Sequence, residues 1–207
     1  MTEPNTSRRE ATKARLVSAG IAEFARRGID ATSVEQLCEA AGFTRGAFYS
    51  NFDSKDELCR AILESRGEVY LAAAREAIAG IEAVDAGKDI TAMISRATSQ
   101  FITATGSDPD AILVMSELRL HAAREPELRT AFREFDESAT PVFGAMVERG
   151  LKDNGLRLTI PIDDALSLLH AVFDQTALDQ LISGQAADAP GAAERLTLVL
   201  QALIVPA

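Results

Sequence analysis

A short segment that begins at Thr44 brings together side chains suited to bind nucleic acid. Arg45 carries a planar guanidinium, which can donate two hydrogen bonds to one guanine base. Thr44 and Tyr49 carry hydroxyl groups that can donate to phosphate oxygens. Gly46 and Ala47 have almost no side chain, so the backbone can approach the edges of bases closely. The segment therefore predicts contact with the major groove of DNA.

Two short helices joined by a tight turn are predicted to position this segment. Ser33, with Gln36 three residues later, has the form of a capping box and predicts a helix from there to about residue 41. Gly42 follows and permits a sharp turn. Thr44 then caps a second short helix. This arrangement is a helix-turn-helix, in which the second helix enters the major groove.

Longer helices are predicted on both sides of the pair. The first covers about residues 8–27, because its apolar side chains recur at helical spacing and Gly28 can end it. Ser54 and Glu57 form a further capping box, which predicts a helix onward to about residue 80. We expect Lys55, at the start of that helix, to contact a phosphate through its charge and the free backbone amides.

The rest of the chain is also predicted to be helical, so the fold class is all-α, with an N-terminal three-helix bundle that contains the helix-turn-helix and a larger helical domain after it. The predicted boundary separates residues 1–54 from residues 55–207. Strand-type alternation is confined to residues 157–160. The later helices are predicted at 88–105, 109–123, 126–153, 161–184 and 190–204, with breaks at glycine and proline.

Charge distribution, cysteine usage and missing motifs exclude several classes of function. The 207 residues carry a net charge of −10, yet the first 60 hold nine basic and nine acidic side chains, so the excess acid lies in the remainder. No apolar run is long enough to span a membrane and no secretory signal is evident. Cys38 and Cys59 fit two reduced thiols in a cytoplasmic protein. Phosphate-binding, nucleophile and metal motifs are absent, which predicts no catalytic residue, no cofactor and no metal.

The helix-turn-helix region resembles the tetracycline-repressor (TetR) family of bacterial transcriptional regulators. The family pattern has a hydroxyl pair, a helix that ends in Ala-Gly, Gly-x-x-Tyr-x-x-Phe, and a helix start similar to Lys-Glu-Leu. The sequence meets it with Thr32-Ser33, Ala41-Gly42, the stretch from Gly46 to Phe52, and the stretch from Lys55 to Leu58. Asn51 departs from the pattern, because many members carry an aromatic residue or histidine there; this bears on the operator sequence.

The resemblance covers residues 8–60 strongly, and beyond them only length and helical content agree. Together with the residue chemistry it implies a set of DNA-binding residues. They are Thr32, Ser33, Thr44, Arg45, Gly46, Ala47, Phe48, Tyr49, Asn51 and Lys55.

The last two predicted helices are apolar on more than one side, which predicts burial on two sides. The resemblance implies that they pair with a second copy of the chain in a four-helix dimer interface; the alternative is that both lie in the core of a monomer. The expected interface residues are Leu169, Val172, Leu196, Val199, Leu200 and Leu203.

The resemblance also implies a small-molecule cavity among the middle helices, although each large side chain there can equally belong to an ordinary core. The excess of acidic residues after residue 60 favours a neutral or cationic, hydrophobic effector. A pocket lined by Arg119 could instead prefer an anion. The candidate lining residues are Phe101, Met115, Arg119, His121, Phe143, Met146, His170, Phe173 and Asp174.

Taken together, these patterns predict a cytoplasmic, homodimeric regulator, a repressor that a small-molecule effector releases from a palindromic operator in double-stranded DNA. Its two recognition helices would lie about 34 Å apart, one turn of DNA. The alternative is a helical protein-interaction module without an effector pocket. Salt dependence separates the two, since only DNA binding weakens steeply as salt rises.

Overall fold

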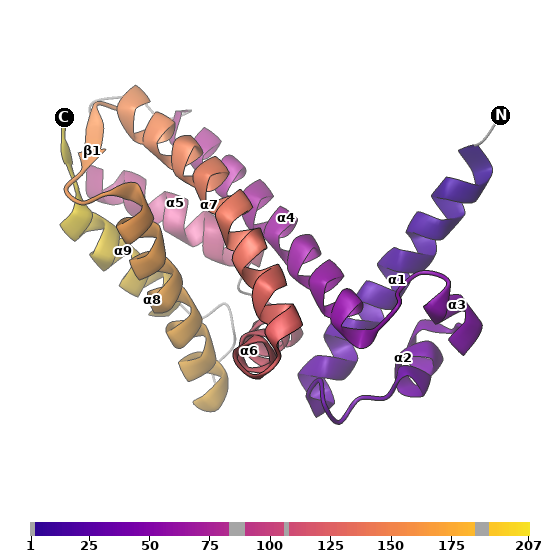
Figure 1. Ribbon diagram of the computed structural model, residues 1–207. Coiled ribbons are helices and arrows are strands. Elements are labelled where there is room, and N and C mark those ends of the chain that lie inside the picture. Colours follow the sequence, from indigo (N-terminus) through magenta and orange to yellow (C-terminus); the bar gives the residue numbers. More distant parts are fainter. Residues whose placement is uncertain (1–2, 83–89, 106–107, 185–190) are drawn as a thin grey trace. The chain divides into compact units, whose positions relative to one another are not determined.

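The computed structural model describes residues 3–82, 90–105, 108–184 and 191–207, and these ranges are mostly helical (Figure 1). The elements in order are α1 (Glu3–Arg27), α2 (Val34–Ala41), α3 (Arg45–Tyr49), α4 (Lys55–Glu82), α5 (Ile90–Thr105), α6 (Pro109–Arg124), α7 (Pro126–Asp153), β1 (Leu156–Leu158), α8 (Ile162–Ile182), α9 (Gly191–Leu203) and β2 (Ile204–Pro206). The predicted all-α class is confirmed. The predicted helix starts at 88 and 190 lie outside the described residues.

Two local features differ from the prediction. Helix α1 begins at Glu3 rather than near residue 8, which is possible because a proline in the first turn, here Pro4, removes no hydrogen bond that the helix needs. The last residues form strand β2, which pairs with β1 in antiparallel register, with Arg157 opposite Val205. A helix cannot continue through Pro206, and the β-branched residues before it favour an extended backbone.

The chain divides into two compact units. The first combines Met1–Arg66 with Asp110–Phe135, and thus holds α1 to α3, the start of α4, α6 and the start of α7. Its core joins Phe24, Phe48 and Phe52 to Leu118 of α6 and Leu128 of α7. Helix α6 therefore belongs to the same hydrophobic core as the helix-turn-helix. The functional boundary at residues 54 and 55 stays a prediction.

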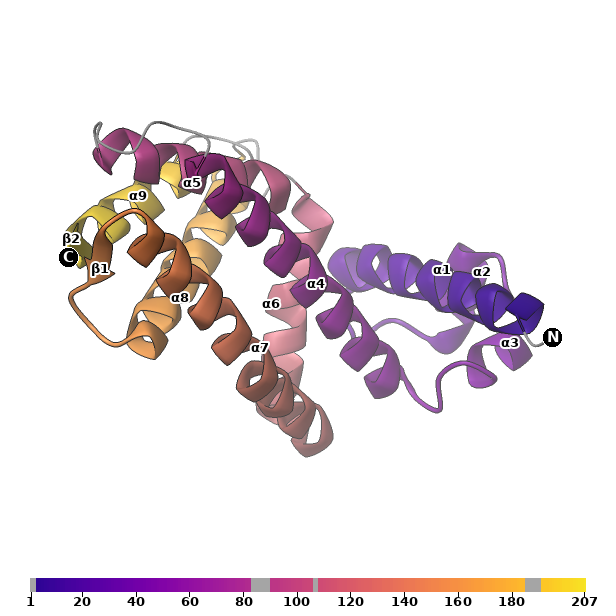
Figure 2. The ribbon, with the colours of Figure 1, turned by 90° about the horizontal axis from the view of Figure 1, so that it is seen from above.

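The second unit combines Gly67–Pro109 with Asp136–Ala207. Helix α9 packs against both α5 and α8 (Figure 2). A small core forms there around Ile102, Phe173 and Leu196, and a hydrogen bond of 2.6 Å joins the hydroxyls of Thr98 and Thr197. The Thr98 hydroxyl also donates to the Ile94 carbonyl of its own helix at 2.9 Å, so this buried pair links α5 to α9 with its hydrogen-bonding groups satisfied.

No helix in the described ranges is both long enough and apolar enough to cross a membrane.

Candidate nucleic-acid interface

The turn between α2 and α3 has the geometry that its sequence predicts. Ser33 accepts a hydrogen bond from the Gln36 amide at 3.3 Å, and the Gln36 side chain accepts one from the Ser33 amide at 2.8 Å. Gly42 adopts φ 71°, a left-handed conformation that favours glycine. Thr44 caps α3 by accepting from the Ala47 amide at 3.3 Å. The predicted capping box, turn and cap are all present.

Helix α3 is anchored on one side and open on the other. Phe48 is fully buried and packs against Phe52, with ring centroids 5.8 Å apart. On the opposite side, a Cβ added at Gly46 would meet only the Thr44 hydroxyl, at 3.8 Å. The short helix therefore presents a nearly bare backbone to solvent while its aromatic side chain holds it to the core.

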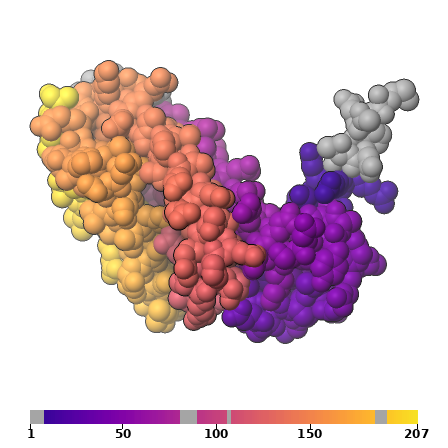
Figure 3. Space-filling model, viewed as in Figure 1, coloured from indigo at the N-terminus to yellow at the C-terminus, as the bar shows by residue number. Residues whose placement is uncertain are grey.

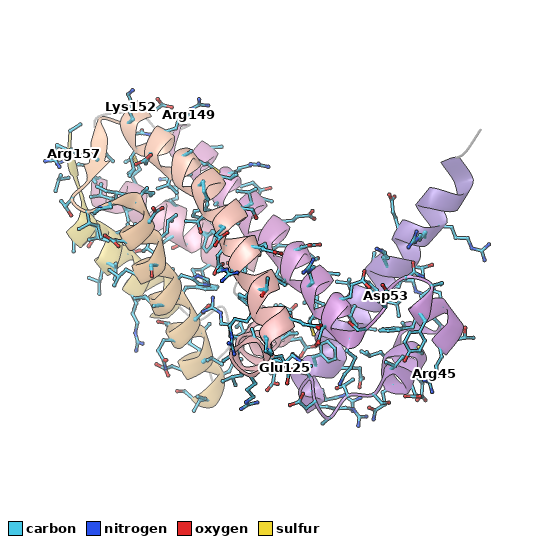
Figure 4. All side chains as sticks on the ribbon, viewed as in Figure 1. Arg45, Asp53, Glu125, Arg149, Lys152 and Arg157 are labelled. Carbon is cyan, nitrogen blue, oxygen red and sulfur yellow. The ribbon has the colours of Figure 1, made fainter. Side chains whose placement is uncertain are left out.

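Arg45 points away from the core of the unit and lies between two neighbours (Figure 4). Its guanidinium donates to the carboxylate of Glu35 and lies 5.8 Å from the centre of the Tyr49 ring. Hydrogen bonding with Tyr49, and then the charge of Glu35, raise the pKa of Arg45. Both side chains of the ion pair are more than half exposed, so the contact restrains Arg45 without removing it from solvent.

Lys55 has a role that its position in the sequence does not reveal. Its ammonium donates to the carbonyls of Ile29 and Thr32, at 2.8 and 3.0 Å. The side chain therefore ties the start of α4 to the loop before α2. The phosphate contact expected for Lys55 would use the third N–H of the ammonium or the backbone amides at the start of α4.

Three other predicted DNA-binding residues are buried rather than presented to solvent. Phe48 belongs to the core, as described above. Thr32 is 1% exposed, and its hydroxyl donates to the Gly28 carbonyl at 2.7 Å. Asn51 is 8% exposed and donates to the Ala47 carbonyl at 2.8 Å, while its Oδ1 has no hydrogen-bond partner in the part of the chain described. The side chains of these three residues do not reach the surface, so they can only support the α2–α3 segment from the interior of the unit.

Two basic residues of α1 lie beside α3 and were not singled out from the sequence. Arg9 donates to the Ser50 carbonyl at 3.5 Å, and the Lys13 ammonium lies 5.4 Å from the centre of the Phe52 ring. The two residues are four positions apart on one helix and therefore lie on the same face, and this spacing in the sequence could have indicated a shared basic surface. Arg15, two residues further, instead donates to the Ala41 carbonyl at 2.8 Å and so holds the end of α2.

The candidate effector residues fall into the two different units. Met115, Arg119 and His121 lie on α6, in the unit that holds the helix-turn-helix. Met115 is part of its core. His121 is 9% exposed, with Nε2 3.1 Å from Asp56 and Nδ1 3.4 Å from Asp30. His121 therefore joins α6 to the start of α4 and to the loop after α1.

The other six candidates lie in the second unit. The Phe173 ring makes edge contacts with Phe101 and Tyr70, at centroid distances of 6.0 and 6.1 Å, within the small core of that unit. His170 lies 3.7 Å from Asp174 on the same helix. Phe143 and Met146 are partly buried on α7.

A shallow hollow in the second unit, which we call the α4–α7 groove, has a volume of about 170 Å³. Its lining residues are Arg75, Ile78 and Ala79 of α4 and Met146, Arg149 and Gly150 of α7. Met146 is the predicted effector residue that it contains.

Half of the six predicted dimer residues on α8 and α9 pack in or against the core of their own chain. Leu196 is 5% exposed and belongs to the core, and Leu169 and Val172 pack against that core. Val199, Leu200 and Leu203 are partly exposed. The outer surface of α8 is uncovered in the view of Figure 3. Three large apolar side chains on these helices are exposed to solvent: Leu168 by 45%, Ile182 by 82% and Leu198 by 65%.

The cysteines are structural residues of the first unit. Cys38 and Cys59 are both buried and free. Burial raises the pKa of Cys59 to about 12. No group of three potential metal ligands occurs within the described ranges.

Comparison with known proteins identifies both halves of the chain. Residues 16–62 match the model of bacterial regulatory proteins of the tetR family, and residues 88–205 match the tetracyclin repressor-like C-terminal domain. The chain belongs to the tetR family of regulators. The N-terminal match contains α2 and α3, so the helix-turn-helix of this tetR-family protein is its DNA-binding element, and the family is not one of enzymes.

Individual relatives agree with this assignment. The HTH-type transcriptional repressor KstR2 of Rhodococcus jostii is 27% identical over 178 residues, which cover 82% of this chain and 81% of KstR2. The fatty acid degradation regulator FadR of Bacillus halodurans has the same fold, with a TM-score of 0.71 at 14% identity over 91% of this chain and 94% of its own. FadR of Bacillus subtilis, solved in complex with stearoyl-CoA, has a TM-score of 0.69 at 15% identity, over 90% and 96% of the two chains.

Proposed function

We propose that this tetR-family protein is a dimeric repressor that binds a palindromic operator and leaves it when a small-molecule effector binds. The open backbone of α3 at Gly46, next to the exposed guanidinium of Arg45, is the observation that carries the proposal. Such a protein acts where bacterial DNA is, in the cytoplasm.

The side chains at the interface divide into two roles. Arg45 has the geometry for the edge of a guanine, because its guanidinium is exposed and restrained at the first turn of α3. The hydroxyls of Ser33, Thr44 and Tyr49 are suited to phosphate oxygens. To these we add Arg9 and Lys13, which place positive charge beside the end of α3.

Selection of bound fragments from genomic DNA, followed by titration of the selected sequence, tests DNA recognition. We expect a site with two half-sites one helical turn apart, and an affinity that falls steeply with salt. Retention of no DNA at low salt would contradict the proposal and favour a protein-interaction module.

An amphipathic effector is supported by two observations. The second unit holds an aromatic core and, on α4 and α7, a groove that carries positive side chains. The FadR structure of Bacillus subtilis, which has the same fold, contains stearoyl-CoA. We therefore infer that an acyl-CoA or a related amphipathic acid releases this protein from DNA.

A thermal-shift series of acyl-CoA thioesters, fatty acids and uncharged alcohols tests the effector class. An effector that binds the native protein raises its melting temperature, and one that releases the operator binds the DNA-free conformation more tightly. We expect the acids and thioesters to do both. Melting shifts confined to cationic or neutral compounds would contradict the proposed class.

A further inference from the structure

Two arginine side chains, Arg75 and Arg149, line the α4–α7 groove. Arg75 and Arg149 are both exposed, and neither forms a hydrogen bond or ion pair with any residue that the structure describes. The acidic residues nearest in sequence, Glu76 and Glu148, are one position away and therefore point about 100° around their helices. Neither lines the groove. The two guanidinium groups thus flank a hollow that no acidic side chain of the described residues lines.

The floor of the groove is apolar and fixed by close packing. Ile78 and Met146 line it. Gly150 is buried, and a Cβ added there would lie 2.8 Å from Cγ2 of Ile78, so any larger residue would push α4 and α7 apart. The close approach of the Ile78 side chain to the Gly150 backbone therefore fixes one part of the floor.

Positive charge continues along this end of the second unit. Lys152 lies three residues after Arg149 and therefore on the same side of α7. Arg157 follows on β1, and Figure 4 shows Arg149, Lys152 and Arg157 where α7 ends and β1 begins. Asp153, four residues after Arg149, also lies on this side of α7, so basic side chains exceed acidic ones here only by a small margin. In a chain with a net charge of −10, that local excess favours an anionic ligand.

We propose that the α4–α7 groove binds the oxyanion group of an amphipathic ligand, a carboxylate or a phosphate, between Arg75 and Arg149. The adjoining apolar part of the ligand lies against Ile78 and Met146. Guanidinium groups donate paired hydrogen bonds to either oxyanion. This inference names one subsite for the effector class proposed above and rests on that proposal.

The size of the groove limits what it holds. Its volume is about 170 Å³. Whole drug-sized ligands occupy pockets of roughly 300–1,000 Å³. The groove therefore accommodates a charged group and a few methylenes. The charge of the whole body favoured a neutral or cationic effector, whereas these local charges favour an anion, because a ligand is selected by the charges that it contacts.

Isothermal titration calorimetry on the full chain tests the subsite directly. The probes are dodecanoyl-CoA, dodecanoate and inorganic phosphate. We expect Arg75→Gln and Arg149→Gln each to weaken binding of the amphipathic probes about tenfold, because each removes charged hydrogen bonds. Arg149→Lys keeps the positive charge but cannot donate the paired hydrogen bonds of a guanidinium. Its affinity for the amphipathic probes should therefore fall less than that of Arg149→Gln. Met146→Gln should weaken dodecanoate binding and leave phosphate binding unchanged.

Arg96→Gln is the matched control. Arg96 is an exposed arginine of α5 in the same unit and does not line the groove. We expect this variant to bind the probes within twofold of the unaltered protein. Melting temperatures of all variants report whether the fold is retained.

The outcomes separate the sources of the oxyanion. Dodecanoate binding that depends on both arginines identifies a carboxylate site, and dependence seen only with dodecanoyl-CoA identifies a phosphate site. Probe affinities that are insensitive to Arg75→Gln and Arg149→Gln, or that fall equally with Arg96→Gln, overturn the inference.

Operator binding is measured in parallel so that the two proposals fail separately. If the unaltered protein binds no operator, or keeps it in the presence of the probes, the proposed function fails. Arginine-dependent calorimetry would in that case still support the subsite. We expect all four arginine variants to retain operator affinity, since none of them lies in the DNA-binding unit.

Discussion

At the scale of single residues, the proposed base contact depends on one exposed guanidinium. Arg45 is the basic side chain on α3 itself, and its contacts with Glu35 and Tyr49 restrain it before DNA is present. A restrained side chain loses less conformational freedom on binding, which favours a specific contact over a general attraction to phosphates. Base recognition by Arg45 is therefore the most direct residue-level test.

We expect Arg45→Ala to weaken operator binding by about 1–3 kcal/mol per half-site and to abolish the preference at one base pair. Titration against a panel of single-base operator variants measures this. Glu35→Gln tests the restraint on Arg45: it should strengthen binding to unrelated DNA because it removes a negative charge, and reduce the preference at that base pair because Arg45 is less restrained. An equal loss for every operator variant would make Arg45 a phosphate contact.

Cys59 offers a residue-level test of the fold. Because burial raises its pKa to about 12, the thiol stays protonated and inaccessible in the folded chain. We expect iodoacetamide at pH 8 to leave Cys59 unmodified in buffer and to modify it in urea, as measured by mass spectrometry. The folded state retains a proton that the unfolded state loses above about pH 9, so Cys59 should lower the free energy of unfolding as pH rises from 9 toward 12. Rapid labelling in buffer would contradict this placement.

At the scale of elements, side chains from distant segments fix the helix-turn-helix. Lys55 holds the start of α4 to the loop before α2, and Arg15 holds the end of α2 to α1. His121 of α6 lies between Asp30 and Asp56. A change in the position of α6 would therefore act on the loop and on α4 together, which gives the first unit a physical route from α6 to the recognition helix.

Lys55→Ala tests which role of this lysine dominates. If its main role is to hold the loop, the variant should lose roughly 1–3 kcal/mol of unfolding free energy, because two carbonyls lose a charged donor. Urea denaturation measures this loss. A role limited to a phosphate contact predicts unchanged stability and a slope of log K against log salt that is smaller by roughly one per subunit. Both measurements on one variant decide between the two.

At the scale of the whole molecule, α8 and α9 carry apolar side chains that the chain itself does not cover. Leu168, Ile182 and Leu198 are exposed by 45% or more, and they lie on the two helices that we propose pair with a second copy. Pairing of these helices with a second copy would remove them from water and set the distance between two recognition helices. This supports the homodimer as the operator-binding form.

We expect light scattering to give about 44 kDa, twice the chain mass of 22.1 kDa. Leu198→Glu should shift the protein to monomers, because an unpaired charge in an interface is costly while an exposed position tolerates it in the single chain. Leu120→Glu, at a leucine of α6 that is 53% exposed, is the control and should leave the dimer intact. A monomeric unaltered protein at micromolar concentration would contradict the assembly.

The sequence by itself determined the elements whose signals are local. Ser33, Gly42 and Thr44 encode caps and a turn within a few residues, because a cap needs only the backbone amides next to it. Apolar spacing, with breaks at glycine and proline, likewise predicted the described ends of the long helices to within a few residues, with the start of α1 as the exception. The predicted starts at 88 and 190 lie outside the described residues. The exposed guanidinium of Arg45 and the open side of α3 followed from the same short segment.

Only the tertiary structure decided which side chains are available for function. Lys55 and Ile29 are distant in sequence, as are His121 and Asp56, so no periodicity predicts that they meet. Leu196 and Leu198 look alike as residues of an apolar helix, yet one is buried in the chain and the other exposed. Burial depends on the packing of several elements at once, which is why a single helix pattern cannot distinguish a core residue from an interface residue.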